Sequence, residues 1–322
     1  MKILSLVHGY PPVQNAGAEW MLHELLKFCV KCGHKVEVLL PISKVTEYDF
    51  EGVTVKKDDW KYTQKAVAEC DLIISHLDKA GRALNLAEYF KKPFVQIIHN
   101  TNFYGILAAK HKDSRGERWA YVVYNSQFTK DEMKYPNPSV IVHPPVDNRR
   151  YKVHKKGKRL TLINLFERKG APFFNDLARA LPEYEFLGVE GGYGKQIHAT
   201  HPNILYMENT PDARKIYSQT RVLLMPSLYE SFGRTAIEAM VSGIPVIAAP
   251  TKGMKESLGE AAIFCDLKLD EWVEAIKRLD NKEYYNEVSK KCIERANVME
   301  KLSHDELDKM ETFFMDIIYK RV

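Results

Sequence analysis

Residues 225–248, MPSLYESFGRTAIEAMVSGIPVIA, join an apolar run to an amphipathic segment through a short polar loop. The run at 222–225 predicts a strand that ends at Pro226, and the apolar spacing of 233–241 predicts a helix that begins at Gly233. In a parallel sheet, anions bind where the carboxyl end of a strand precedes a helix N-terminus, because unpaired backbone N–H groups point outward there. This segment therefore predicts an α/β unit with a diphosphate site after the strand.

Apolar runs and helix-like segments alternate on both sides of this stretch. Apolar strands separated by helices indicate parallel sheets that are covered on both faces. We therefore expect an α/β protein of two Rossmann-like domains, at residues 1–150 and 151–304, with a C-terminal helix at 305–322 that packs back on the first. Strands are expected at 3–7, 36–40, 53–55, 72–75, 94–98, 121–124, 140–142, 160–165, 184–189, 204–207, 222–225, 245–249 and 262–265, and helices at 19–32, 172–180, 211–218, 233–241, 269–279 and 283–298.

Length and composition suit such a fold. The 322 residues, 45% of them hydrophobic, are enough to bury two cores, which excludes a disordered or coiled-coil chain. No apolar run reaches the length of a membrane span, and the opening MKILSLV is expected to be a strand and not a signal peptide. The five scattered cysteines predict reduced thiols in a cytoplasmic protein, with Cys29 and Cys32 as buried thiols of a helix and not a metal site.

The junction between the expected domains is strongly basic. Residues 148–166 contain no acidic side chain, and the simplest interpretation is a solvated linker. The alternative is contact with an anionic surface, either a membrane to which the protein binds peripherally or a nucleic acid, since clustered positive charge with aromatic residues can follow a phosphate backbone. The basic residues are Arg149, Arg150, Lys152, Lys155, Lys156, Lys158 and Arg159.

Two glutamates bracket the loop and the start of the helix in the first stretch. Glu230 precedes the expected helix, while Glu238 lies more than one turn inside it, so the two carboxylates would reach different parts of an elongated ligand. Carboxylates accept hydrogen bonds, and the vicinal hydroxyls of a sugar can donate them. A single glutamate in such a place is usually a solvated surface residue, but the pair beside a diphosphate site favours a sugar nucleotide.

The same stretch, with seven residues between Glu230 and Glu238, resembles the donor-site signature of retaining GT-B glycosyltransferases of family 4, the glycosyl transferases group 1. The resemblance implies two Rossmann-like domains that face each other across a cleft. It also implies a metal-independent, retaining hexosyltransferase that moves a sugar from a nucleotide diphosphate sugar, with UDP-hexose favoured, to a hydroxyl of a glycan or glycolipid. Further similar segments are 8–19, 33–36, 98–100, 140–147, 169–170 and 252–256.

The resemblance also assigns roles to individual residues. The catalytic set would be Glu230, His99 and Lys169: Glu230 contacts the donor sugar, His99 lies near the anomeric carbon, and Lys169 neutralises the leaving diphosphate. Glu238 would hold the ribose diol, and Gly17 would let the backbone approach the phosphate. The full donor-binding set is Gly17, Asn164, Arg168, Lys169, Glu230, Ser231, Phe232, Gly233, Arg234, Thr235 and Glu238.

Two departures from the family pattern keep other functions open. Asn164 stands where arginine is usual, with Arg168 as a substitute cation, and Ala16 stands where a first glycine is common. Asn164 favours the alternative of a non-catalytic module that binds a nucleotide sugar or a polyanion. Another alternative is transfer to a modified nucleic-acid base. The chain has no Asp-x-Asp pair, so we expect no metal, and no cofactor besides the nucleotide sugar as co-substrate.

Overall fold

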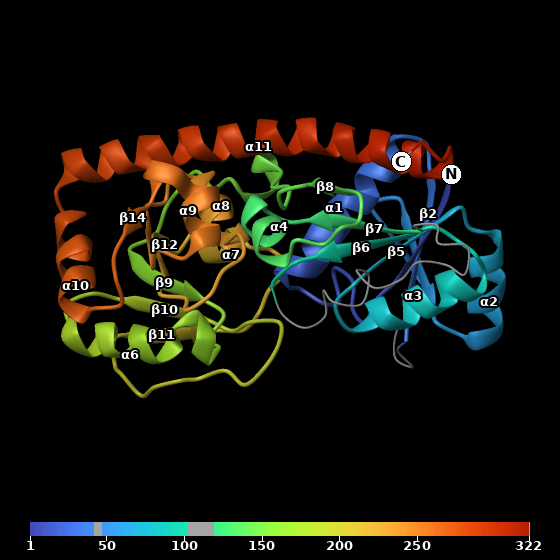
Figure 1. Cartoon of the computed structure of the whole chain (residues 1–322). Helices are drawn as coiled ribbons and strands as arrows, with labels where there is room; N and C mark the ends of the chain where they lie inside the picture. Colours follow the sequence, from blue (N-terminus) through green and yellow to red (C-terminus); the bar gives the residue numbers. More distant parts are fainter. Residues whose placement is uncertain (42–46, 102–118, 322) are drawn as a thin grey trace. The chain divides into compact units, whose positions relative to one another are not determined.

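The computed structural model describes residues 1–41, 47–101 and 119–321 of the chain (Figure 1). Contacts between residues divide it into two compact units. Unit 1 consists of Met1–Gln14, Ala18–Pro145 and Ser303–Val322, and unit 2 of Asn15–Gly17 and Val146–Leu302. Along the described part of the chain, no helix is both long and apolar enough to cross a membrane.

Unit 1 is built on a mainly parallel sheet of eight strands. The β3–β4 pair alone is antiparallel among the paired strands described in this sheet. Strand β3 is missing from the expected strands, because three residues are too short a run to show a strand period. In spatial order the strands are β3 (Tyr48–Phe50), β4 (Val53–Lys57), β2 (Lys35–Leu40), β1 (Lys2–Leu6), β5 (Leu72–His76), β6 (Phe94–Ile98), β7 (Ala120–Tyr124) and β8 (Ser139–Ile141).

Helices cover both faces of this sheet. They are α1 (Gly17–Lys31), α2 (Trp60–Glu69), α3 (Ala80–Tyr89) and α4 (Gln127–Met133), with a short turn η1 (Leu77–Lys79). Ile3 of β1 shares a core with Leu22 of α1, whereas Leu4 packs with Val67 of α2 and Leu84 of α3. Consecutive residues of β1 therefore enter different cores, because side chains alternate between the faces of a strand.

Unit 2 is built on a parallel sheet of six strands. In spatial order these are β11 (Ile204–Met207), β10 (Phe186–Val189), β9 (Arg159–Ile163), β12 (Thr220–Met225), β13 (Val246–Ala248) and β14 (Ile263–Phe264). The connecting helices are α5 (Asn148–Tyr151), η4 (Glu167–Lys169), α6 (Ala171–Ala180), α7 (Arg214–Tyr217), α8 (Arg234–Met240), α9 (Lys252–Leu258), η5 (Gly259–Ala261) and α10 (Leu269–Arg278). The α/β fold class expected from the alternation is confirmed.

The strand order of unit 2 reverses direction between β9 and β12. The chain moves outward from β9 through β10 to β11, then returns to place β12 on the other side of β9 and continues to β13 and β14. The connections that leave the carboxyl ends of β9 and β12 therefore diverge. In open α/β sheets such a reversal creates the crevice in which ligands bind.

The end of the chain is one helix, α11 (Lys282–Ile318), and not the two segments expected at 283–298 and 305–322 (Figure 1). The sequence between these segments contains neither glycine nor proline, so nothing in it breaks the backbone hydrogen bonds. The first part of α11 supplies Cys292 and Met299 to the core of unit 2. Its last part supplies Met310 and Phe314 to a core of unit 1.

Two further expectations from the sequence are wrong in part. The basic stretch is not a solvated linker throughout, because it forms α5 and buries Tyr151, and only residues 152–158 between α5 and β9 are irregular and largely exposed. Cys29 is buried as expected, but Cys32 is exposed, because α1 ends at Lys31 and Gly33, at φ 85°, turns the chain away from the helix.

We expect Phe314→Ala to lower the free energy of unfolding by about 3 to 5 kcal/mol, since Phe314 is 1% exposed in the core of unit 1. Urea unfolding followed by circular dichroism measures this loss. Tyr319→Ala, which removes a ring that is 59% exposed just beyond the same helix, should cost far less. Equal effects of the two substitutions would contradict the packing of the end of α11 in unit 1.

Candidate functional site

The residues predicted to bind a donor gather where β9 and β12 end. Asn164, Arg168 and Lys169 follow β9, whereas Glu230 belongs to the loop that follows β12. The two strands are parallel neighbours, with Thr161 opposite Leu223, so their carboxyl ends meet at one edge of the sheet. This edge is also where the strand order reverses, and it therefore combines the predicted residues with the favoured position for a ligand.

An ion pair joins the two loops at this edge. The Lys169 Nζ atom donates to Glu230 Oε1 at 2.5 Å, although 61 residues separate the two side chains in sequence. Ser227 donates from its hydroxyl to the same oxygen at 3.1 Å. Glu230 is only 8% exposed, so its negative charge relies on these two donors. The arrangement holds one cation and one carboxylate side by side at the predicted site.

Close backbone contact fixes the position of this ion pair. Gly170 has φ 88°, in the left-handed region that favours glycine, and a Cβ atom there would collide with the carbonyl oxygen of Pro226. The backbone N–H of Leu228 donates to the carbonyl oxygen of Arg168 at 3.0 Å. Lys169 lies between these contacts, so its loop cannot move without disturbing the loop that carries Glu230.

Asn164 has a structural reason to differ from the family arginine. Its φ is 75°, which asparagine tolerates better than most residues, and its Oδ1 atom accepts a hydrogen bond from the backbone N–H of Phe166 at 3.2 Å. The guanidinium of Arg168 lies over the ring of Phe166, 5.4 Å from its centre. Asn164 therefore shapes the loop, and Arg168 is the cation of this loop besides Lys169.

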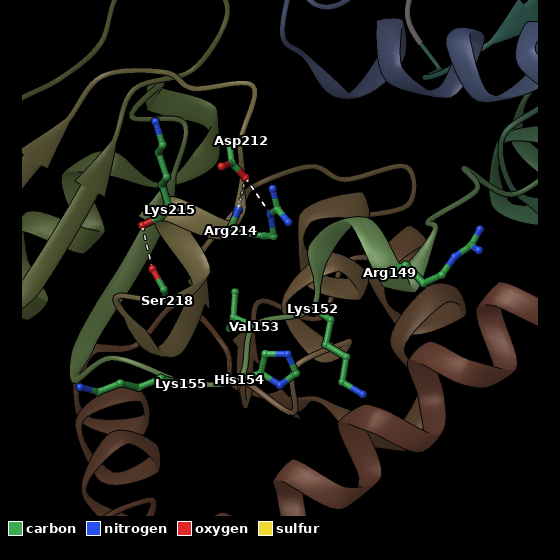
Figure 2. Close-up of a pocket in the computed structure, with 9 residues that line it drawn as sticks. All are labelled: Arg149, Lys152, Val153, His154, Lys155, Asp212, Arg214, Lys215 and Ser218. Carbon is green, nitrogen blue, oxygen red and sulfur yellow. Dashed lines mark hydrogen bonds and ion pairs between the residues drawn. The ribbon is translucent and has the colours of Figure 1, made fainter. Parts of the chain in front are cut away.

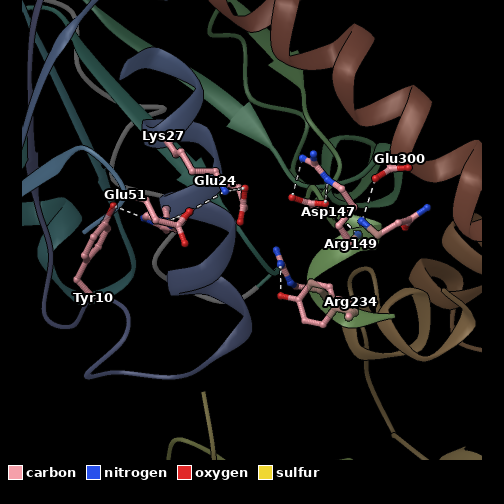
Figure 3. A network of polar contacts seen from close by, with 11 residues as sticks. Tyr10, Glu24, Lys27, Glu51, Asp147, Arg149, Arg234 and Glu300 are labelled. Carbon is pink, nitrogen blue, oxygen red and sulfur yellow. Dashed lines mark hydrogen bonds and ion pairs between the residues drawn. The ribbon is translucent and has the colours of Figure 1, made fainter. Parts of the chain in front are cut away.

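Glu238 is held by a second, separate network within unit 2. Arg234 Nε donates to Glu238 Oε1 at 2.8 Å, and the Tyr217 hydroxyl donates to Glu238 Oε2 at 2.8 Å. Arg234, labelled in Figure 3, also donates to the hydroxyl of Tyr151 at 2.9 Å. Burial, and then the nearby Glu238 carboxylate, raise the pKa of Tyr217 well above its ordinary value, so that this hydroxyl stays protonated and remains a donor. The carboxylate of Glu238 is thereby fixed in orientation.

The loop between the two glutamates leads into α8 through Gly233. This residue precedes the helix with φ 83°, and Phe232 beside it is 2% exposed. The carbonyl oxygen of Phe232 accepts a hydrogen bond from the hydroxyl of Ser257 on α9. At Gly253 of α9, an added Cβ would collide with the backbone of Ser231. Helix α9 therefore supports the loop from behind. Thr235 is partly buried, and its Oγ1 atom lies 3.9 Å from Met225 Sδ.

His99 belongs to a polar cluster in unit 1. It follows β6, and its Nε2 atom lies 2.8 Å from Nδ1 of His76, so one imidazole donates to the other. Beside them, His8 Nε2 lies 3.3 Å from Oε1 of the fully buried Glu19. The side-chain amide of Asn125 donates to the carbonyl oxygen of His99 at 3.0 Å. The predicted catalytic histidine is thus held by neighbours that the sequence did not single out.

Burial decides the charge of these histidines. It lowers the pKa of His76 to about 4 and that of His99 well below its ordinary value, so both rings are neutral at pH 7. The hydrogen bond with Glu19 raises the pKa of His8. Ligand atoms of His8, Glu19 and His76 lie within 4.8 Å of one another, a spacing that suits a metal ion. Within this group His8 contacts Glu19, and His76 contacts His99 outside it.

Several residues of these networks could not be found from the sequence. Tyr151 and Tyr217, which hold Arg234 and Glu238, lie 66 residues apart in segments interpreted as linker and helix. Gly17, in contrast, was predicted as a close-approach position, and an added Cβ there would meet no atom within 4 Å. Packing within the protein therefore does not require glycine at residue 17, and its role toward a ligand stays a prediction.

Comparison with known proteins connects unit 2 to a family. Residues 169–281, about a third of the chain, match the family model described as glycosyl transferases group 1. The O-antigen chain mannosyltransferase B of Escherichia coli is 34% identical over 65 residues, which are 20% of this chain and 17% of that protein. The uncharacterized glycosyltransferase MJ1607 of Methanocaldococcus jannaschii is 40% identical over 48 residues, 15% of this chain and 12% of that protein. Each match spans less than a fifth of the relative's length.

Solved structures share the fold over nearly the whole chain. A sucrose-phosphate synthase from Thermosynechococcus elongatus has a TM-score of 0.78 and 14% identity, covering 99% of this chain and 100% of that chain. Anabaena Alr3699/HepE, in complex with UDP and glucose, has a TM-score of 0.74 and 17% identity, covering 97% and 99%. At these identities the likeness is one of fold. The resemblance to the glycosyl transferases group 1 that the sequence indicates is confirmed for residues 169–281 by the family model, and the GT-B fold is confirmed by the solved structures.

We expect Gly253→Ala to destabilise unit 2, because the new methyl group must displace the loop backbone at Ser231. The free energy of unfolding should fall by about 1 to 3 kcal/mol, measured by urea denaturation. Lys255→Ala, an exposed change on the same helix, is the matched control and should have little effect. Equal stability of the two variants would show that α9 does not support the loop.

We expect the protein to lose stability between pH 7 and pH 5, because a buried His76 with a pKa of about 4 is protonated mainly after unfolding. This contribution is complete above pH 6.5 and is lost as the pH falls toward 4, whereas the raised pKa of His8 acts in the opposite direction. His76→Asn should reduce the loss by about 2 kcal/mol, measured by urea unfolding at both pH values. The exposed His154→Asn should leave it unchanged, and an unaltered loss in His76→Asn would contradict the assignment.

Proposed function

We propose that this chain, which has the GT-B fold and matches the glycosyl transferases group 1 family at residues 169–281, is a glycosyltransferase that uses a nucleotide diphosphate sugar. The observation that carries the proposal is the Lys169–Glu230 ion pair at the strand reversal of unit 2. A nucleotide sugar carries an anionic diphosphate next to a sugar with hydroxyl donors. Lys169 can bind the diphosphate, and Glu230 can accept hydrogen bonds from the hydroxyls.

In this proposal each network of unit 2 binds one part of the donor. Lys169 and Arg168 face the diphosphate, Glu230 accepts from sugar hydroxyls, and Glu238, fixed by Arg234 and Tyr217, accepts from the ribose diol. The backbone of 231–235 would contribute N–H groups to the phosphates, as the start of a helix does. Lys169 would stabilise the charge that develops on the leaving diphosphate.

The finer parts of the function are also proposals. Uridine is the favoured base and hexose the favoured sugar, and support comes from a neighbour in fold, Alr3699/HepE, whose structure contains UDP and glucose. We propose retention of anomeric configuration, transfer without a metal ion, and a hydroxyl of a glycan or glycolipid as acceptor. The contribution of His99 at the anomeric carbon and a cytoplasmic location belong to the same proposal.

The donor assignment is tested by the affinities of wild-type protein and a Glu238→Gln variant for UDP and 2′-deoxy-UDP, measured by calorimetry. If Glu238 binds the ribose diol, the wild type should prefer UDP by about tenfold, and the variant should lose that preference. Glu274→Gln, an exposed change on α10, is the control and should retain it. The same preference in all three proteins would remove Glu238 from the ribose site.

The same proteins distinguish the competing functions. Thermal stabilisation by UDP, GDP and ADP identifies the base, because a ligand at 100 times its Kd stabilises the folded state by about 2.7 kcal/mol. Unchanged UDP affinity after addition of EDTA is expected for metal-free binding. Binding of UDP-hexose with no release of UDP over a panel of glycans, glycolipids and modified DNA would support the non-catalytic module, while release with DNA would support the nucleic-acid acceptor.

A further inference from the structure

A pocket of about 610 Å³ lies in unit 2, lined by residues of two chain segments (Figure 2). We call it the cationic pocket. The first segment runs from α5 toward β9, and the second contains α7. None of its lining residues belongs to the predicted donor site. The lining residues are Arg149, Lys152, Val153, His154, Lys155, Asp212, Arg214, Lys215 and Ser218.

Helix α7 separates this pocket from the predicted ribose site. Its Tyr217 is fully buried and donates to Glu238. Arg214, Lys215 and Ser218 are exposed and line the cationic pocket instead. The two sets of side chains leave the same short helix in different directions, so a ligand in the pocket need not overlap a donor held by Glu238.

The charge of the cationic pocket is strongly unbalanced. Five lysine and arginine side chains line it against one carboxylate, Asp212, which already accepts from Arg214 Nε at 3.0 Å. Arg149 pairs with Asp147 at 3.2 Å. Lys152, Lys155 and Lys215 make no ion pair with any residue that the structure describes. Like charges repel one another, so such a gathering favours an anion between them.

The other basic residues of the stretch 149–159 have different tasks. Lys156 donates to the carbonyl oxygen of Gly243 at 3.0 Å, and burial lowers its pKa. Lys158 and Arg159 both pair with Glu185. The stretch is therefore not a continuous basic track of the kind that follows a nucleic-acid backbone. Its two remaining lysines, Lys152 and Lys155, which make no ion pair with any described residue, instead line a pocket that α7 borders, and their ammonium ends point in different directions there (Figure 2).

The lining of the pocket favours phosphate over a base or a membrane interior. Among the described residues that line it there is no Phe, Tyr or Trp, so they offer no large aromatic face on which a nucleobase could stack. Of the lining residues that the structure describes, Val153 alone is apolar, which is too little to insert into a lipid bilayer. Lysine and arginine side chains are the usual donors to phosphate oxygens.

We propose that the cationic pocket binds a phosphorylated ligand that carries a diphosphate or clustered phosphate groups, either free or as the headgroup of a lipid. The unpaired lysines Lys152, Lys155 and Lys215 provide the attraction, and Arg214 provides a directional fork beside them. This site is distinct from the diphosphate site at Lys169, and its occupation requires no transfer activity.

The test measures pyrophosphate binding by calorimetry in a Lys169→Met/Glu230→Gln background, which neutralises the donor-site ion pair as a unit. In this background Lys152→Gln/Lys215→Gln should weaken binding by about tenfold or more, and higher salt should weaken the remaining binding of the parent protein. Lys158→Gln/Lys290→Gln removes the same charge from exposed positions of unit 2 outside the pocket and is the matched control. Melting temperatures verify that every variant is folded.

Each result decides a part of the proposal. Equal pyrophosphate affinity in the pocket variant and the control variant would overturn it, as would the absence of binding in the parent background. Sedimentation with phosphatidylcholine vesicles that contain phosphatidic acid, lost in the pocket variant, identifies a lipid headgroup. Pyrophosphate binding without vesicle binding identifies a free ligand. Pocket-dependent binding of single-stranded DNA that is tighter than pyrophosphate binding would assign the surface to nucleic acid and overturn the phosphate-ligand assignment.

Discussion

The contact between Lys169 and Glu230 is the interaction on which the site of unit 2 depends. It joins the loop after β9 to the loop after β12, two segments that only the reversal of strand order brings together. Gly170 makes the contact possible, because any larger residue would push its loop away from Pro226. A carboxylate that is 8% exposed is costly without a cation, so the pair also contributes to holding the two loops in place. Lys169 therefore has two roles that compete: it stabilises Glu230 within the protein, and on the proposed function it must also bind a diphosphate.

The network around Glu238 also stabilises a buried carboxylate, but it does so with one donor on each oxygen. Glu238 receives hydrogen bonds on both oxygens, from Arg234 and from Tyr217, and each of these donors is itself buried. A carboxylate oxygen has more than one acceptor position, so these bonds fix the orientation of Glu238 without exhausting its capacity. Glu238 has a fixed carboxylate, whereas Glu230 has a carboxylate whose ion pair a ligand can replace. On the proposed function Glu238 binds the ribose, which all nucleotide sugars share, and Glu230 binds the sugar that is transferred.

The candidate site residues of unit 2 could be predicted from the sequence, but the residues that hold them in place could not. Strand and helix periods are local, so the positions of β9, β12 and α8 could be predicted closely, and so could the residues at their ends. The contacts of Tyr151 and Tyr217 depend on which strands become neighbours, and a local pattern does not contain that information. The same limit explains the basic stretch, where charge was visible but the side chains that pair with Glu185 or Gly243 were not. Helix α11 was predicted as two segments because mostly polar residues stand between Met299 and Leu307, although Ser303 and Glu306 continue the buried face there.

The predicted donor site and the cationic pocket differ in whether their positive charges are already paired within the protein. At the predicted donor site Lys169 already donates one N–H group to Glu230, so a diphosphate there would share the remaining donors of Lys169 or draw it away from Glu230. On the proposed function, sugar hydroxyls can then donate to Glu230 in place of Lys169. A ligand that carries a diphosphate and sugar hydroxyls provides a partner for both Lys169 and Glu230. A bare phosphate binds Lys169 but offers Glu230 no hydroxyl donors in exchange. On the proposed function, this difference favours an intact nucleotide sugar over free phosphate. The cationic pocket has unpaired lysines, and the described residues that line it include a single carboxylate, Asp212, so no comparable ion pair must be exchanged when an anion binds. The two sites therefore differ in selectivity for a physical reason: one exchanges an internal ion pair for a ligand, and the other relieves repulsion between like charges.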